Sequence, residues 1–188
     1  VFEDIEMPLL KVLAIMELYG IKIDIKQLQE LSEKVTEEVV ELEKKIFKLA
    51  GTEFNINSPA QLGEILFQKL QLKGKVRKTG GGALSTAASE LEKLRDEHPI
   101  IDLIMQYREL QKLKNTYIDT FPQLISPMDQ RLHTTFNQTG AVTGRLSSQD
   151  PNLQNIPIRT KLGQKFRRAF VAEPGFKLVS FDYSQVDL

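Results

Sequence analysis

Cysteine and tryptophan are absent from this 188-residue sequence, and histidine occurs only at His98 and His133. The lack of cysteine excludes disulfide bonds and thiolate chemistry, and two histidines leave little for a zinc site. No apolar run approaches the roughly 18 residues that a membrane-spanning helix needs, and the N-terminus lacks the features of a signal peptide. These absences favour a cytoplasmic protein. Because the initiator methionine is missing, we expect the sequence to begin inside a longer chain.

An excess charge of either sign is also lacking, because 25 Lys and Arg residues balance 25 Asp and Glu residues. A net charge of zero would argue against a nucleic-acid partner if the charges were evenly spread. Residues 1–50, however, carry 7 basic and 11 acidic groups, whereas residues 131–188 carry 8 and 4. Most of the cations in the second segment are arginines, whose guanidinium groups match phosphate oxygens. The basic segment therefore indicates either a phosphate-bearing partner or a solvated surface.

The first two thirds of the sequence have the apolar spacing of helices. Leu28, Leu31, Val35, Val39 and Leu42, for example, recur at steps of three and four. Capping and breaking residues then set the ends of each helix. The basic, glycine-rich stretch at residues 73–82 is expected to be a mobile loop. Helices are predicted over residues 7–19, 24–50, 58–70, 85–97 and 98–120.

Helical periodicity stops after Pro122. Extended segments are expected at residues 131–137, 141–146 and 177–183, with a short helix near residues 163–170. A helical part followed by strands and a short helix favours an α+β fold. The last extended segment has nothing after it to cover it, so we expect the sequence to be truncated at its C-terminus.

A polar stretch near the middle of the basic segment carries side chains that can donate hydrogen bonds to the base edges of a DNA duplex. It contains TGRLSS at residues 143–148 and PNLQNIP at residues 151–157. Such arginine and amide side chains can donate to purine N3 and pyrimidine O2, the minor-groove acceptors that all base pairs present in similar places. The alternative is a loop whose asparagine and serine side chains cap its own turns. Composition alone favours that alternative.

The helical part offers further candidates for contacts with a phosphate backbone. Residues 55–58 supply backbone N–H groups at a helix start. The glycines of residues 79–82 lack the lysine–serine pair and preceding strand of a P-loop, which discounts a nucleotide cradle. On the last expected helix, four side chains could follow phosphates, although a solvated helix face is the more common explanation. These four share one face at steps of three and four: Arg108, Lys112, Asn115 and Thr116.

Asp182 follows the apolar segment of residues 176–181. A carboxylate at a strand end is well placed to bind Mg²⁺, which takes one or two protein carboxylates beside phosphates. Asp187 lies five residues further on, and this offset places it on the opposite face of a continuing strand. A single strand-end aspartate is more often a turn former, so this residue alone does not predict a metal site.

Taken together, these segments closely resemble family A DNA polymerases, the bacterial DNA polymerase I type. The resemblance rests on HTTFNQTGAVTGRLSSQDPNLQNIPIRTKLGQKFRRAF and LVSFDYSQVDL, with FNINSPAQL, KTGGGALST and YRELQKLKNTY upstream in the same order. It implies that residues 1–20 end a preceding exonuclease-like domain, that residues 21–125 form the helical thumb, and that residues 126–188 begin the palm. The implied activity adds deoxynucleotides to a primer 3′ end, with primer–template DNA and deoxynucleoside triphosphates as partners.

The resemblance also implies a role for each matching residue. Asp182 would be the catalytic carboxylate that binds two Mg²⁺ ions, and the backbone carbonyl of Tyr183 would be a further ligand. Ser184, Gln185 and Asp187 would lie at the incoming nucleotide. Contacts with DNA are implied for the palm residues Arg145, Asn152, Gln154, Asn155 and Arg159, and for the thumb residues Arg108, Lys112, Asn115, Thr116, Asn57 and Ser58.

One position departs from the family pattern. The family usually has glutamate where this sequence has Asp187, and that glutamate blocks the ribose 2′-hydroxyl. The shorter side chain leaves more room at the sugar. We therefore expect the complete polymerase to incorporate ribonucleotides more readily than its Asp187→Glu variant, and equal incorporation by the two would contradict this.

The family's fingers helix and second metal-binding aspartate would lie beyond Leu188. A site with one carboxylate side chain should not hold two ions productively, so the 188-residue chain alone is expected to be inactive. Two alternatives stay open. The chain could be a non-catalytic duplex-DNA-binding module, or one half of a split polymerase that a second chain completes with the fingers and the rest of the palm.

Overall fold

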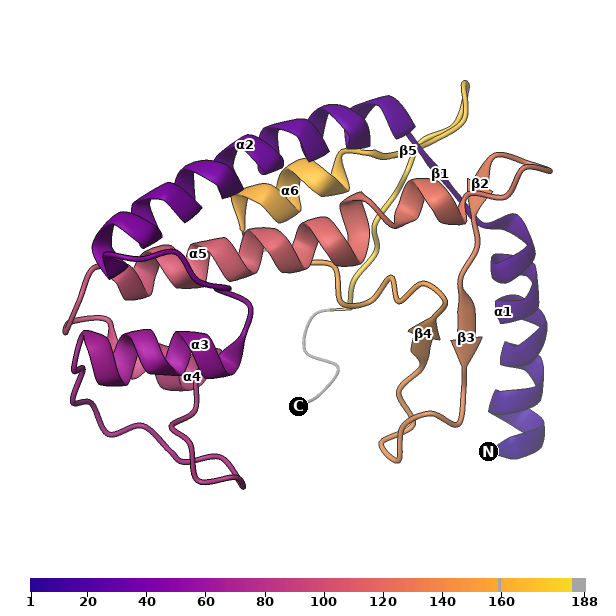
Figure 1. The fold of residues 1–188 in the computed structure, drawn as a ribbon. Coiled ribbons are helices and arrows are strands. Elements are labelled where there is room, and N and C mark those ends of the chain that lie inside the picture. The colour runs from indigo at the N-terminus through magenta and orange to yellow at the C-terminus, as the bar shows by residue number, and fades with distance from the viewer. Residues whose placement is uncertain (159, 184–188) are drawn as a thin grey trace. The chain divides into compact units, whose positions relative to one another are not determined.

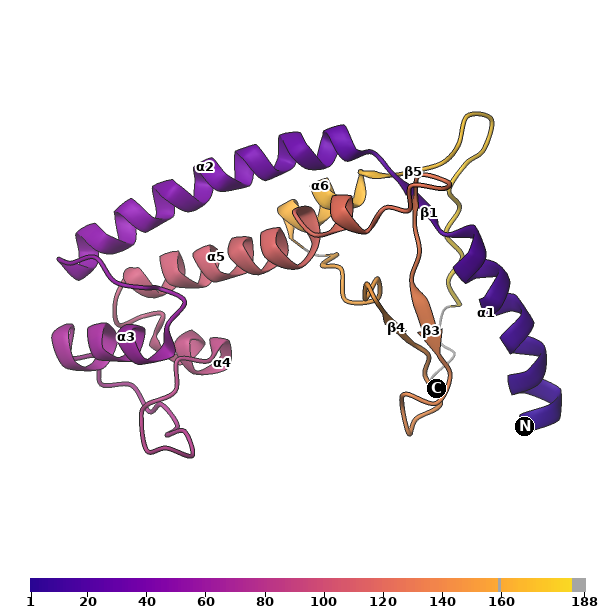
Figure 2. The ribbon, with the colours of Figure 1, turned by 45° about the vertical axis from the view of Figure 1, so that its right-hand side comes forward.

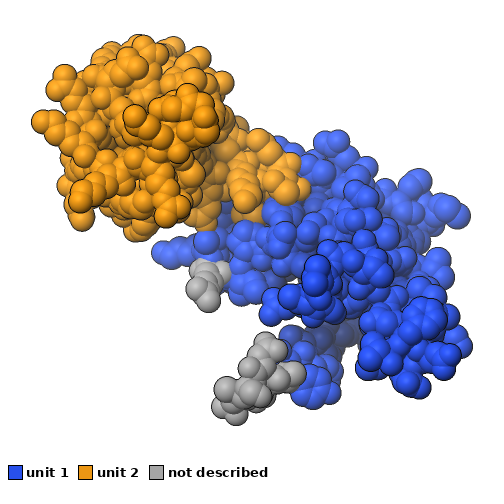
Figure 3. Space-filling model, turned by 90° about the horizontal axis from the view of Figure 1, so that it is seen from below, with its two compact units in different colours: residues 1–31, 117–188 blue, residues 32–116 orange. Residues whose placement is uncertain are grey.

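The structure, a computed structural model, describes residues 1–158 and 160–183. The chain divides into two compact units, one formed by residues 1–31 and 117–188 and the other by residues 32–116 (Figure 3). Helices dominate, and short strands occur in the first unit, so the expected α+β class is confirmed. Among the described helices, none combines the length and the apolar content needed to cross a bilayer.

Residues 32–116 form a helical unit. Val35, Val39, Leu42 and Ile46 are buried along one face of its longest helix at the predicted spacing. Figures 1 and 2 show this helix, α2, running alongside α5, and the hydroxyl of Tyr107 on α5 bridges the two. The unit contains most of α2 (Ile25–Ala50), then α3 (Pro59–Gly63) with its continuation η2 (Glu64–Lys69), α4 (Ala88–Leu91) with η3 (Glu92–Leu94), α5 (Ile100–Leu113), and the first three residues of η4 (Lys114–Ile118).

The expected helix at residues 85–97 is shorter in the structure, because its regular part spans residues 88–94. The stretch at residues 73–82, expected to be a mobile loop, is closed by backbone contacts. Lys78 and Leu84 form a β-bridge, and the N–H of Thr79 donates to the Ala83 carbonyl at 2.7 Å. Glycines at its tip permit the tight reversal, since Gly82 has a φ of +83°.

The first unit holds two small antiparallel sheets. In one of them β1 lies between β2 and β5, with Ile21 opposite Leu132 and Ile23 opposite Phe170. In the other, β3 pairs with β4 so that Phe136 lies opposite Ser148. The elements of this unit are η1 (Phe2–Glu6), α1 (Met7–Tyr19), β1 (Ile21–Ile23), η5 (Phe121–Leu124), β2 (Arg131–Leu132), β3 (Thr135–Asn137), β4 (Ser147–Gln149), α6 (Lys161–Arg167) and β5 (Phe170–Val171).

Four aromatic rings form the centre of this unit. Phe121 and Phe166 are fully buried, and their ring centroids lie 5.5 Å apart in an edge-to-face arrangement. Tyr117 and Phe170 pack against both of them. This geometry suits the quadrupoles of aromatic rings and adds to the free energy gained by their burial.

Two expectations about strands were wrong, and strand β1 was missed, because three residues between two helices carry no readable period. The strand expected at residues 141–146 lies instead at Ser147–Gln149. Residues 177–183 form no strand, because no described strand pairs with them, and Val179 and Phe181 are exposed. Apolar β-propensity alone does not make a strand without a hydrogen-bonded neighbour.

The short helix expected near residues 163–170 is present but begins earlier, since Thr160 caps it.

Candidate nucleic-acid interface

The loop that follows β4 is held in place by hydrogen bonds between its own amide side chains and the backbone. Gln154 donates from Nε2 to the Leu146 carbonyl at 3.1 Å, and its Oε1 accepts from the N–H of Ser148 at 3.2 Å. The Oδ1 of Asn152 accepts from the N–H groups of Gln154 at 2.9 Å and Asn155 at 3.2 Å. Both side chains therefore cap the loop itself, which is what the turn-capping alternative predicts. A DNA contact by either one stays a prediction and would have to use the donors that these bonds leave.

Arg145 and Asn155 stand at the two ends of the segment that Gln154 fastens. Both side chains are exposed. Gly144, directly before the arginine, has a φ of +75°, a conformation that favours glycine and turns the chain sharply. A guanidinium and an amide on a fastened backbone form a set of hydrogen-bond donors of the kind that minor-groove acceptors require.

Helix α6 adds positive charge next to this loop. The hydroxyl of Thr160 accepts from the N–H of Gly163 at 3.1 Å and caps the helix. A Cβ at Gly163 would lie 2.3 Å from the Pro157 carbonyl oxygen, so the glycine lets the helix pack directly on the PNLQNIP segment. From the sequence, the cations of this helix enter only the count of basic residues in the segment 131–188, and no DNA contact was predicted for them. Four of them are exposed on α6 and its C-terminal end: Lys161, Lys165, Arg167 and Arg168.

In the helical unit, the Arg108 guanidinium donates hydrogen bonds to backbone carbonyls of the protein. Its guanidinium donates from Nη1 to the Thr86 carbonyl at 2.5 Å and from Nη2 to the Ile56 carbonyl at 3.4 Å. The side chain is half-buried, and this burial lowers the pKa of Arg108 from its usual value. These bonds occupy part of the guanidinium, and the contact with DNA implied for Arg108 stays a prediction. Lys112, by contrast, is exposed.

Asn115 and Thr116 follow on the same helical stretch, in η4, and both are exposed. The sequence predicts one α-helical face for them and Lys112, but the helix continues as a π-helix from Lys114 to Ile118. Their contact with a DNA backbone stays a prediction.

Three backbone N–H groups at the helix start of residues 55–58 have partners nearby in sequence: those of Asn55, Asn57 and Ser58. Asn57 donates its N–H to Oδ1 of Asn55 at 2.9 Å, and Asn55 donates its N–H to Oε1 of Gln61 at 2.7 Å. The hydroxyl of Ser58 accepts from the N–H of Gln61. These bonds correct the idea that the backbone N–H groups of Asn55, Asn57 and Ser58 are free donors to a phosphate. The contacts implied for Asn57 and Ser58 therefore rest on their side chains.

The side chain of Asn57 donates to the hydroxyl of Tyr107 at 3.3 Å, and that hydroxyl donates to Oε1 of Glu43 at 3.0 Å. Burial raises the pKa of Tyr107, so its hydroxyl stays protonated and able to donate.

Asp182 and Tyr183 are exposed at the end of the described chain. The Asp182 carboxylate has the oxygen chemistry that Mg²⁺ prefers. Across the described residues, however, no three His, Cys, Asp or Glu side chains gather as a group that could hold an ion. These residues do not make a Mg²⁺ site by themselves. Four residues with implied roles lie outside the described part of the chain: Arg159, Ser184, Gln185 and Asp187.

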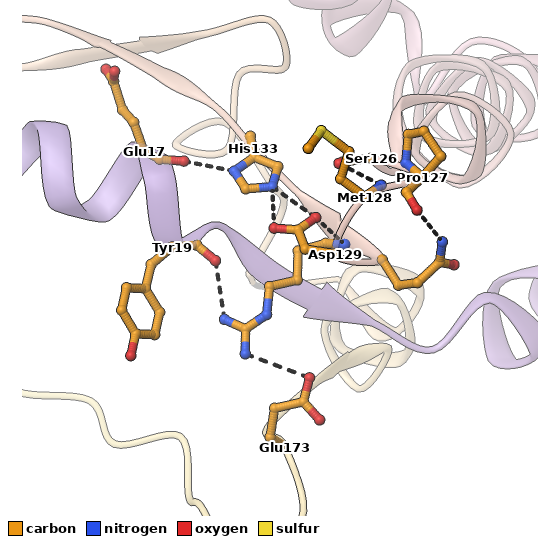
Figure 4. Close-up of polar contacts among 10 residues, drawn as sticks. Glu17, Tyr19, Ser126, Pro127, Met128, Asp129, His133 and Glu173 are labelled. Atoms are coloured by element: carbon orange, nitrogen blue, oxygen red, sulfur yellow. Dashed lines mark hydrogen bonds and ion pairs between the residues drawn. The ribbon is translucent and has the colours of Figure 1, made fainter.

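A cluster of charged residues that sequence reasoning missed joins α1 to the strands (Figure 4). His133 lies between the Glu17 carbonyl, 2.6 Å from Nδ1, and the Asp129 carboxylate, 2.9 Å from Nε2. Arg131 donates to the Tyr19 carbonyl at 3.0 Å and reaches Glu173 at 3.5 Å. More than 100 positions separate these partners from α1 in sequence, and no short-range pattern connects them.

The comparisons with known proteins agree with this architecture. The family model for DNA polymerase family A matches residues 25–188. The chain is 58% identical over 189 aligned residues to a thermostable DNA polymerase I of Thermus thermophilus, and 49% identical over 187 to the DNA polymerase I of Deinococcus radiodurans. All of this chain is covered in both alignments, but only 22% and 20% of the relatives. The chain thus spans about a fifth of their length.

Among solved structures, the chain is similar to the POL domain of Pol1 from M. smegmatis, in a complex with DNA primer-template and dNTP. The TM-score is 0.85 at 38% sequence identity, and the match covers 93% of this chain and 30% of that one. A family match over most of the chain, together with identities of this size, identifies its ancestry. The chain belongs to DNA polymerase family A.

Proposed function

We propose that residues 1–188 comprise the end of a preceding exonuclease-like domain, the thumb and the first part of the palm of a DNA-directed DNA polymerase. The observation that carries this proposal is the alignment of the entire chain with polymerase I relatives at 49–58% identity. The complete protein adds deoxynucleotides from deoxynucleoside triphosphates to a primer 3′ end. The proposed boundaries are residues 1–20 for the end of a preceding exonuclease-like domain, 21–125 for the thumb and 126–188 for the palm.

Within this proposal, the chain's role is to hold primer–template duplex. Arg145 and Asn155 contact the minor groove, and the cations of α6 neutralise phosphates beside it. This division is supported by the exposure of these side chains and by the fastened backbone between residues 146 and 154. Contacts with phosphates, and with the purine N3 and pyrimidine O2 acceptors that every base pair presents in the minor groove, do not depend on base sequence. A polymerase needs this property, because it must accept every template.

Magnesium belongs to the proposal for the complete polymerase, with Asp182 as one ligand of two ions. Since the described residues gather no metal-binding group, we propose that the 188-residue chain does not extend primers alone. Incubation with primer–template, Mg²⁺ and all four deoxynucleoside triphosphates tests this. Primer extension by the purified chain would contradict it.

Duplex binding is tested separately, by fluorescence anisotropy with labelled primer–template, blunt duplex and single-stranded DNA of the same length. The proposal predicts tighter binding to both duplexes than to the single strand, because the contacts fit duplex geometry. Equal affinity for all three DNAs, or none for any, would contradict it.

A further inference from the structure

Two hydroxyl groups meet inside the first unit, directly behind the loop proposed to contact DNA. The Oγ1 of Thr134, just before β3, lies 2.6 Å from the Oγ of Ser148 on β4. The residues are 8% and 2% exposed. Polar groups this deeply buried are stable only where hydrogen bonds replace the water they have lost.

The available partners account for both hydroxyl protons. Thr134 lies 2.8 Å from the Pro151 carbonyl oxygen and 3.0 Å from that of Gln149. Ser148 accepts from the N–H of Leu153 at 3.1 Å, and its own hydroxyl lies 3.3 Å from the Pro151 carbonyl oxygen, a longer alternative to its contact with Thr134. One consistent arrangement therefore runs from the Leu153 N–H to Ser148, from Ser148 to Thr134, and from Thr134 to the carbonyls of the loop. Each hydroxyl has one proton to donate, and the chain of bonds uses both.

This chain of bonds fixes the loop at points that the Gln154 amide does not reach. Gln154 bonds to the backbone of Leu146, directly before β4, and of Ser148 in β4. The hydroxyl pair instead bonds to the backbone of residues 149, 151 and 153. Arg145 and Asn155 lie immediately outside the fastened span. Small shifts in this span would therefore move both of these side chains relative to a duplex.

We infer that Thr134 and Ser148 are positioning residues for minor-groove contact: their hydroxyl pair sets the loop geometry that aims Arg145 and Asn155 at the duplex. This inference rests on the proposed function. Neither hydroxyl touches DNA, because both are buried beneath the loop. The role requires the hydroxyl groups and not merely side chains of the right volume.

Substitution of the buried threonine tests this with a matched control one residue away. Thr134→Val keeps the shape and removes the hydroxyl, Thr134→Ser restores it, and Thr135→Val makes the same chemical change at an exposed position. Amide hydrogen exchange reports whether the loop is held. Anisotropy with ordinary duplex, and with duplex that carries 3-deazapurines in place of purines near the primer end, reports minor-groove contact.

In Thr134→Val we expect faster exchange at the Leu153 amide, roughly tenfold weaker duplex binding, and loss of the affinity difference between ordinary and 3-deazapurine duplex. Thr134→Ser should recover all three properties, and Thr135→Val should keep them. Unchanged exchange in Thr134→Val would overturn the inference without involving DNA. Faster exchange with unchanged duplex affinity would overturn the positioning role alone. Absence of duplex binding by the unsubstituted chain would instead contradict the proposed function and, with it, the aim assigned to the loop.

Discussion

The imidazole Nε2 of His133 lies 2.9 Å from Oδ2 of Asp129, while its Nδ1 lies 2.6 Å from the Glu17 carbonyl oxygen in the last turn of α1 (Figure 4). A carbonyl and a carboxylate both accept hydrogen bonds. Only the doubly protonated imidazolium can donate to both at once. The contact with a helix C-terminus also favours the positive charge.

The arrangement predicts a pH-dependent attachment of α1. The Glu17 carbonyl, and then Asp129, raise the pKa of His133 above 6.5, so its contribution is complete below that value and is lost as the pH rises through the raised one. His133 chiefly lowers the pKa of Asp129 below 3.8, so the carboxylate's contribution is lost only as the pH falls through the lowered value. The pair therefore stabilises the fold most between about pH 4 and pH 6.5.

Chemical denaturation of His133→Gln checks this. The loss in free energy of unfolding should be larger at about pH 5.5 than at about pH 9, because the unsubstituted protein loses the imidazolium contacts at the higher pH. His98→Gln is the control, since the Nδ1 of His98 accepts from the N–H of Ile100 at 3.2 Å and donates nothing there. An equal loss at both pH values would count against the imidazolium.

Alanine substitutions at Arg108 and Lys112 should have different effects, the first mainly on the free energy of unfolding and the second mainly on duplex affinity. Arg108→Ala leaves two carbonyls without their donor and should lower the free energy of unfolding by about 1–3 kcal/mol. Lys112→Ala removes an exposed charge and should change that free energy by less than about 0.5 kcal/mol while weakening duplex binding. Thermal unfolding and anisotropy measure the two effects. A stable Arg108→Ala variant would show that its carbonyl contacts matter little.

Phe166 should be the most sensitive aromatic position. It is fully buried among Tyr117, Phe121 and Phe170, so Phe166→Ala should cost about 3–5 kcal/mol. Phe176→Ala serves as the control, because Phe176 is 76% exposed. Similar losses for the two variants, measured by urea denaturation, would contradict the packing described for this unit.

The elements that could be predicted from sequence are those with a local cause. Helix α2 follows from apolar residues at steps of three and four, and these residues form its buried face. Strand β1 escaped prediction because its hydrogen bonds go to residues more than 100 positions away. For the site, the motif blocks predicted that the loop around residues 143–157 contacts DNA, and this stays a prediction. Which side chains face outward depends on tertiary bonds, as Gln154 illustrates by turning its amide to β4.

Arg108 shows the same limit on the helical unit. Its spacing placed it correctly on one helix face with Lys112, but the carbonyls of Ile56 and Thr86 reach it only through the fold. The buried hydroxyls of Thr134 and Ser148 gave no local signal either, since their partners come from separate segments.

The dependence of duplex affinity on salt, measured for the unsubstituted chain and for single alanine variants, tests the central claim most directly. Between about 50 and 200 mM salt, the logarithm of the binding constant should fall linearly with that of salt concentration. Lys165→Ala should make this slope shallower by about the amount that one phosphate contact contributes. Arg145→Ala should weaken binding equally on all DNA sequences. Lys45→Ala, on α2, should change neither the slope nor the affinity. A salt-independent affinity, or equal binding by Arg145→Ala and the unsubstituted chain, would contradict the account.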